Sequence, residues 1–270
     1  RAREHGTAKD RGFERAHVMV SRQVPAPSPS AVQIAAVADR VGAMMARQKM
    51  KDCSGASAMD PRTQVTSVHG CSVLDLALQP LEANFALPLI HEIPQENDLG
   101  LLGVALGAEA NLVGDPALIA ADAARDAGNS PNSVMAAATS IIGPKRVERT
   151  LACNRALIDL FANSGLKEGS DESFDTSQLK MDEETRQMFL ARPEESGDPR
   201  PEAMLAALAA RGGKSVFLRY LRSFGARLSR DAILAAIALT IAWGPLMRKR
   251  ISRITAETLP WYLRLYGVMV

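Results

Sequence analysis

The stretch that decides the fold covers residues 229–253 and reads "SRDAILAAIALTIAWGPLMRKRISR". From Ala232 to Met247 it holds no charged residue, and a basic cluster begins at Arg248. These 16 residues fall short of the ~20 that cross a bilayer, and a Gly-Pro pair interrupts them near their end. We therefore predict the buried central helix of a protein core, and no membrane span.

The composition of the chain favours helices throughout. Hydrophobic residues make up 47% of the 270 residues and aromatic residues only 4%, so the apolar side chains are mostly Ala, Leu, Val and Ile. Small and unbranched residues of this kind suit helices that pack closely. We predict an all-α protein, long enough for one large or two modest domains.

Charge and cysteine content exclude several classes of function. The formal net charge of +2 argues against a dedicated nucleic-acid binder. Residues 200–270 nevertheless hold twelve Lys or Arg against three acids, whereas residues 167–195 hold four against nine, so an anionic partner would favour the C-terminal quarter. Three cysteines without a CxxC pair encode neither a disulfide framework nor a zinc site, and no signal peptide opens the sequence. A cytoplasmic protein is expected.

Four segments are predicted along the chain. Residues 1–30 form a flexible N-terminal arm that ends in "VPAPSPS", and residues 31–165 form the first part of a large helical domain. Residues 166–228 hold an acidic loop, expected to be mobile at its start, and a small helical domain; residues 229–270 are the core helix and a tail. Asp115, Ser130 and Ser229 are predicted helix caps, and "TQVTSV" at 63–68 a short extended piece.

Several segments resemble, in the right order, the citrate synthase superfamily in the short form used by citryl-CoA lyases. "SPNSVMAAATSIIGP" (130–144) resembles the small-residue helix that leads into a Gly-Pro-Leu-His-Gly turn of the family. "SGDPRPEAML" (196–205) resembles the segment that follows the second catalytic histidine, where Asp-Pro-Arg recurs. "IALTIAWGPLM" (237–247) resembles the Ala-Arg-Thr-Val-Gly-Trp helix, and "LPWYLRLYG" (259–267) resembles the family's tail.

The resemblance implies a citrate-synthase-like multi-helix fold with a large and a small helical domain. It also implies a homodimer, or a heteromer with a related subunit, that binds a CoA thioester and a carboxylic oxo acid. In the family, two histidines and an aspartate make or break a carbon–carbon bond through an enol. The reaction needs a carboxylate base for the thioester methyl and hydrogen-bond donors for the enolate and the keto oxygen.

The catalytic positions of the family hold other residues in this chain. The four histidines, His5, His17, His69 and His91, fall on none of the motifs. Lys145 and Arg146 stand at the family's first histidine, and Glu194 and Glu195 stand at its second. Phe217 stands at the aspartate base, and Leu239 stands at the arginine of the late helix. The catalytic residues of the chain are therefore unknown from its sequence.

Four residues remain as candidates for ligand binding. Asp198 and Arg200 keep the family's Asp-Pro-Arg, and Arg200 is predicted to clamp a substrate carboxylate. Lys145 and Arg146 open a helix, where they would contact CoA phosphates; the alternative is a solvated first turn. Glu194 and Glu195 would serve either as a replacement base or as part of the flexible acidic loop.

Two further clusters carry weaker signals. His91 with Glu92 and Glu96 lacks the spacing of a metal site, and no metal is predicted. The basic residues from Arg248 to Arg253 either complement the dipole at a helix C-terminus or meet phosphate. Three hypotheses of function follow: a protein that acts on a CoA thioester with rearranged catalytic groups, a non-catalytic partner subunit, or an unrelated helical enzyme of other chemistry.

Overall fold

The computed structural model describes residues 56–110 and 114–269, which belong to one compact unit, Gly55–Val270. The predicted arm at residues 1–30 and the helical pattern that begins at residue 31 lie outside the described residues. The division of the rest into a large and a small domain stays a prediction.

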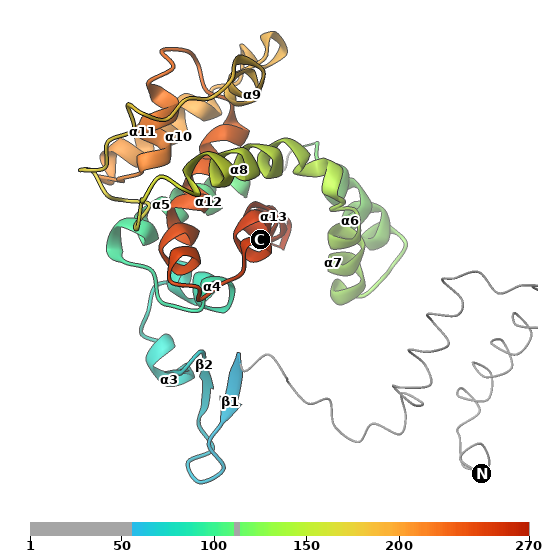
Figure 1. Ribbon diagram of the computed structural model, residues 1–270. Coiled ribbons are helices and arrows are strands. Elements are labelled where there is room, and N and C mark those ends of the chain that lie inside the picture. Colours follow the sequence, from blue (N-terminus) through green and yellow to red (C-terminus); the bar gives the residue numbers. More distant parts are fainter. Residues whose placement is uncertain (1–55, 111–113, 270) are drawn as a thin grey trace, which may run out of the picture. The chain divides into compact units, whose positions relative to one another are not determined.

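The central helix of this unit is α12, Arg230–Met247. The hydroxyl of Ser229 caps it by accepting a hydrogen bond from the Ala232 N–H at 3.1 Å. Every residue from Ala232 to Pro245 is buried, which confirms the predicted core helix. The helix is long and apolar enough to cross a bilayer, but 78% of it is buried inside the fold. The partners that cover it include α8 (Glu148–Phe161), α13 (Arg253–Met269) and α5 (Glu96–Glu109) (Figure 1).

The other elements surround this core and confirm the all-α fold class. Two 3-10 turns, η3 (Pro144–Arg146) and η4 (Pro193–Glu195), precede α8 and α10. The remaining helices are α3 (Val73–Leu76), α4 (Leu81–Ile90), α6 (Pro116–Asp126), α7 (Pro131–Ser140), α9 (Glu183–Phe189), α10 (Arg200–Ala210) and α11 (Val216–Arg222).

One small antiparallel sheet precedes the helices. Its strands are β1 (Ser57–Met59), β2 (Thr66–Val68) and β3 (Cys71–Ser72), in the order β1-β2-β3. Ser57 pairs with Val68, and Ser67 pairs with Ser72. The predicted extended piece is therefore confirmed as β2.

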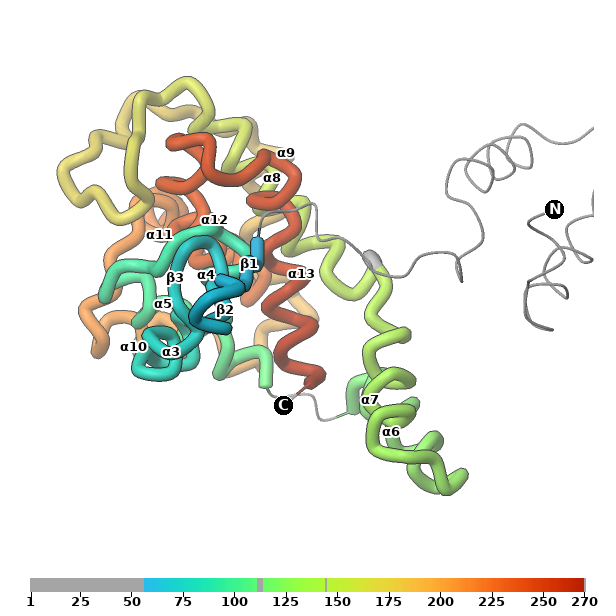
Figure 2. The backbone as a smooth tube through the Cα atoms, turned by 90° about the horizontal axis from the view of Figure 1, so that it is seen from below, coloured from blue at the N-terminus to red at the C-terminus, as the bar shows by residue number. Residues whose placement is uncertain are grey.

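Helices α6 and α7 form a hairpin that extends away from the rest of the unit (Figure 2). Both predicted caps are present, because Asp115 accepts from the Ala117 N–H and Ser130 accepts from the Ser133 N–H. A small cluster of Ala117, Ala138, Ile142 and Val268 is the apolar contact between this hairpin and α13.

The acidic segment after residue 165 is fastened to the core, unlike the mobile loop that its composition suggests. Trp243 donates its indole N–H to the Leu166 carbonyl at 3.1 Å, and the Val216 N–H donates to the Gly169 carbonyl at 2.8 Å. Arg219 donates to the carbonyls of Glu172 and Phe174. These donors belong to α11 and α12. The acidic residues therefore belong to a segment whose backbone is fixed on the outside of the core.

A glycine sets how closely α13 approaches α5. A Cβ atom on Gly267 would lie 2.1 Å from the backbone oxygen of Glu109, whereas a Cβ atom on Gly107 would meet nothing within 4 Å. We expect Gly267→Ala to lower the free energy of unfolding by about 1–3 kcal/mol, because backbone has to shift. Gly107→Ala should instead raise it by about 0.5–1 kcal/mol, since alanine favours a helix interior. Urea denaturation of the two variants checks this, and equal effects would contradict the close contact.

Candidate functional site

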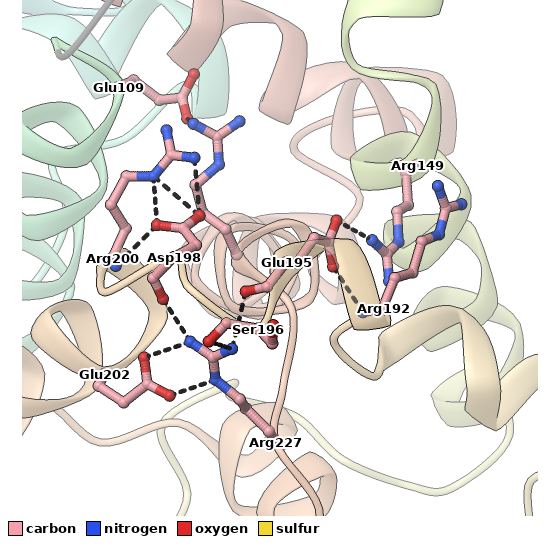
Figure 3. A network of polar contacts seen from close by, with 10 residues as sticks. Glu109, Arg149, Arg192, Glu195, Ser196, Asp198, Arg200, Glu202 and Arg227 are labelled. Carbon is pink, nitrogen blue, oxygen red and sulfur yellow. Dashed lines mark hydrogen bonds and ion pairs between the residues drawn. The ribbon is translucent and has the colours of Figure 1, made fainter.

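Asp198 and Arg200, the predicted carboxylate-binding pair, lie at the start of α10 and bind each other. Asp198 accepts from the Arg200 backbone N–H at 3.0 Å, from its Nε at 2.8 Å and from its Nη2 at 2.7 Å (Figure 3). These hydrogen bonds hold the pKa of Asp198 below its usual value. The helix begins at Arg200, so Asp198 binds both the first backbone N–H of α10 and the guanidinium of the same residue.

Arg227 fixes the segment that leads to this pair, and the sequence patterns do not single it out. Its guanidinium donates to the carbonyls of Glu195 at 2.8 Å and Ser196 at 2.9 Å, and to the carbonyl of Asp198. It also donates to both oxygens of the Glu202 carboxylate (Figure 3). One arginine therefore ties three backbone carbonyls of residues 195–198 to Glu202 of α10.

Glu195, the candidate replacement base, is held by two donors. Its carboxylate accepts from Arg149 Nη1 at 2.6 Å and from the Arg192 N–H at 2.9 Å. Burial alone would raise the pKa of Glu195, but these two donors together hold it below its usual value. A carboxylate with a low pKa is a weak general base. Glu194 is exposed in the same turn.

A buried chain of alternating charges lies beside the Asp198–Arg200 pair. Glu109 is only 2% exposed, and its carboxylate lies 3.2 Å from Arg264 and 3.6 Å from Arg230. Asp115 accepts from Arg264 and, at 2.7 Å, from Arg146. Arg146, predicted to contact CoA phosphates, is therefore paired with the cap of α6.

The two predicted binding pairs are linked through this chain of charges. The hydrogen bonds to Asp198 raise the pKa of Arg200, and the charge of Glu109 adds to the effect. Arg200 and Arg146 therefore lie on two sides of one network, with Glu109 between them. Lys145 is exposed and makes no hydrogen bond or ion pair to the part of the chain that the structure describes. An anionic ligand would have to compete with internal carboxylates for Arg146 and Arg200.

Phe217, which the sequence resemblance predicts at the position of the family's base, lies inside the hydrophobic core. Phe217 is fully buried, with its ring centroid 4.7 Å from Phe161 and 5.3 Å from Trp243, both edge to face. Leu239, which takes the place of the family's arginine, is also fully buried on α12. Edge-to-face rings fill this space closely, so the site offers neither a carboxylate nor room for one.

The two histidines among the described residues, His69 and His91, contact each other. His69 and His91 stack with ring centroids 4.0 Å apart, and His91 Nδ1 lies 2.9 Å from the Arg250 carbonyl. Within residues 56–110 and 114–269 no group of three His, Cys, Asp or Glu side chains could hold a metal ion. His5 and His17 lie outside the described residues.

Asp98 is a titratable residue that sequence reasoning missed. Burial raises the pKa of this carboxyl to about 6, although the Asn97 amide, 3.0 Å away, lowers it, and the charges of Glu168 and Glu92 raise it further. Asn97 also exchanges hydrogen bonds with the backbone of Lys214 at 2.7 and 3.2 Å. Asp98 therefore lies one residue from a contact with the loop that leads to α11. No local pattern marks it, because its burial is tertiary.

Removing the central carboxylate tests the buried network. We expect Glu109→Ala to lower the free energy of unfolding by about 3–5 kcal/mol, because the buried charges of Arg264 and Arg230 then lose the carboxylate that faces them. The matched control is Glu202→Ala, whose carboxylate is 56% exposed and should leave stability nearly unchanged. Chemical denaturation of both variants is the measurement, and a mild effect of Glu109→Ala would contradict the network.

The burial of Asp98 predicts a pH dependence of stability. Since its pKa is raised in the folded protein, the folded state keeps this proton longer than the unfolded state does, and stability falls as pH rises from about 4 to about 6. At pH 7 the variant Asp98→Asn should be more stable by roughly 1–3 kcal/mol.

Denaturation curves at pH 4.5 and pH 7 separate this effect from others. The gain from Asp98→Asn should shrink at the lower pH. Asp126→Asn, at an exposed position on α6, should show no such change. An Asp98→Asn effect that is independent of pH would rule out the raised pKa.

The comparisons with known proteins support the fold and nothing finer. No family model matches the sequence, and no curated protein matches it. Among solved structures, the citryl-CoA lyase from Hydrogenobacter thermophilus matches with a TM-score of 0.53 and 17% sequence identity, over 83% of this chain and 88% of that one. At this identity the likeness speaks for the fold. The chain therefore has the all-α, citrate synthase-like fold that its sequence predicts.

Proposed function

We propose that the chain is a non-catalytic citrate-synthase-like protein that serves as a partner or regulatory subunit. One observation carries the proposal: the residue in the place of the family's base, Phe217, is a fully buried phenyl ring in an aromatic cluster. Enol chemistry needs a positioned proton acceptor at this point. A core ring cannot take a proton, and its neighbours leave no space for a substitute.

The nearby carboxylates support the same proposal. Asp198 is bonded to Arg200, and Glu195 is bonded to Arg149. Both pKa values lie below their usual range, so neither group is suited to remove a proton from carbon at neutral pH. The charged groups around α10 thus stabilise backbone and each other.

Exposed apolar residues on the α6–α7 hairpin support a role through association. Ile119 is 62% exposed, Met135 47% and Ile141 43%. The apolar contact between the hairpin and α13 is a small cluster. Exposed apolar side chains that lie together mark association surfaces. The partner would be a second copy of the chain or a related subunit.

Substitutions that place negative charge on the α6–α7 hairpin test this proposal. We expect sedimentation of the purified chain, alone or with a citrate-synthase-like subunit from the same organism, to show an assembly that Ile119→Glu with Met135→Glu dissociates. Leu78→Glu, at a residue that is 85% exposed but not on the hairpin, should leave the assembly intact. The same preparation should neither cleave citryl-CoA nor condense acetyl-CoA with an oxo acid. A stable monomer without a partner, or measurable turnover, would contradict the proposal.

A second candidate function is supported by Asp98. In this alternative the chain acts on a CoA thioester and an oxo acid, and Asp98 is the base, since its pKa of about 6 is suited to proton transfer. Turnover of citryl-CoA by the native chain, lost in Asp98→Asn but kept in Asp126→Asn, would favour this candidate over the first.

A further inference from the structure

A patch of exposed apolar side chains covers α3 and the start of α4. Leu78 is 85% exposed, Leu74 65%, Leu81 60% and Val73 38%. All four lie within residues 73–81, so they are close together on the surface. We call these four side chains the leucine patch. A single exposed leucine is common, whereas apolar side chains that are exposed together mark a surface that meets a partner.

The local structure turns these side chains outward. The hydroxyl of Ser72 caps α3 by accepting from the Leu74 N–H at 3.1 Å. The Leu78 N–H donates to the Asp75 carbonyl at 3.1 Å, which continues the turn beyond the last residue of α3. Leu76 is buried, and α3 packs on β2 and β3 beside the start of α4 (Figure 1). Leu74 and Leu78 are four residues apart in this turn and therefore share its exposed side.

One carboxylate lies within this apolar surface. Asp75 is exposed, and it is the charged residue of the stretch 73–81. Its side chain makes no hydrogen bond or ion pair to the residues that the structure describes. Residues 63–124 hold eight Asp or Glu and no Lys or Arg, so no cation that is close in sequence neutralises it.

Asp75 limits what can cover the leucine patch. Burial of a carboxylate without a partner costs free energy, so lipid tails or a wholly apolar surface would leave it uncompensated. A second copy that met the same patch across a two-fold axis would bring a second Asp75 against the first. A partner that carries a cation beside its apolar face avoids both costs.

We propose that the leucine patch binds an amphipathic helix of another protein, with a lysine or arginine at the edge of its apolar face. Apolar side chains one turn apart on that helix cover Leu74, Leu78 and Leu81, and the cation pairs with Asp75. This surface is separate from the α6–α7 hairpin, so the inference goes beyond the proposed association. Leu78→Glu should abolish helix binding while it leaves the hairpin assembly intact.

Fluorescence anisotropy of the full chain with a labelled synthetic helix tests the proposal. The probe is an amphipathic peptide of leucine and lysine, and its matched control has glutamate in place of lysine. We expect saturable, equimolar binding of the lysine peptide and binding of the glutamate peptide that is weaker by about tenfold or more, since a charge-assisted pair is lost. Asp75→Asn should reduce this preference.

A pair of substitutions tests the apolar contact without adding charge. Leu74→Ser with Leu78→Ser should weaken binding of the lysine peptide about tenfold or more, because less apolar surface is buried. Ile254→Ser, at a residue that is 72% exposed but outside the leucine patch, is the matched control and should bind as the native chain does. Thermal unfolding curves report whether each variant keeps the fold.

Three outcomes would overturn the proposal. The first is unchanged peptide binding in Leu74→Ser with Leu78→Ser, or equal affinity of the native chain for the two peptides. The second is a dimer of the chain that these two substitutions dissociate, which would assign the leucine patch to a second copy. The third is flotation with phosphatidylcholine vesicles that the same variant loses, which would assign it to a lipid surface.

Discussion

The structure depends on the complete burial of α12. Fourteen consecutive residues, Ala232–Pro245, are buried, so helices have to cover every side of it. Gly169 lets the acidic segment approach α12 closely, since a Cβ atom on it would lie 2.5 Å from the backbone oxygen of Thr240. Trp243 then joins the cluster of Phe161 and Phe217 and also holds the acidic segment through its indole N–H. Burial of the apolar side chains of this one helix thus positions α8, α11 and the acidic segment after residue 165.

The same burial requires apolar side chains at Phe217 and Leu239, the two positions that the sequence resemblance compares with the family's base and arginine. A base or an arginine at the positions of Phe217 and Leu239 would put a charge into this aromatic and aliphatic core, which is costly unless a partner is present. With apolar residues at both positions, the core is continuous. Charge is concentrated instead around Glu109 and at the start of α10, where arginines and carboxylates satisfy one another.

The arginines of the chain show that residue type does not define a site. Arg200, which the sequence predicts to bind a carboxylate, donates to its neighbour Asp198, and Arg227 uses its donors on backbone and Glu202. Arg222, which no motif marks, makes no hydrogen bond or ion pair within the described residues. A guanidinium binds a ligand only if its donors are not already used, and this depends on residues that are distant in sequence.

The sequence by itself determined the helices, their caps and the core helix, because apolar periodicity and capping residues act over a few residues. Ser130, Asp115 and Ser229 cap helices as predicted, and the order of the segments was enough to predict the citrate synthase-like fold. Only the tertiary structure decided which charges meet. Arg264 and Glu109 are 155 residues apart, and the charges of Glu168 and Arg248 that act on the pKa of Asp98 come from elements far along the chain. Pairing and desolvation are properties of packed neighbours, which local patterns do not encode.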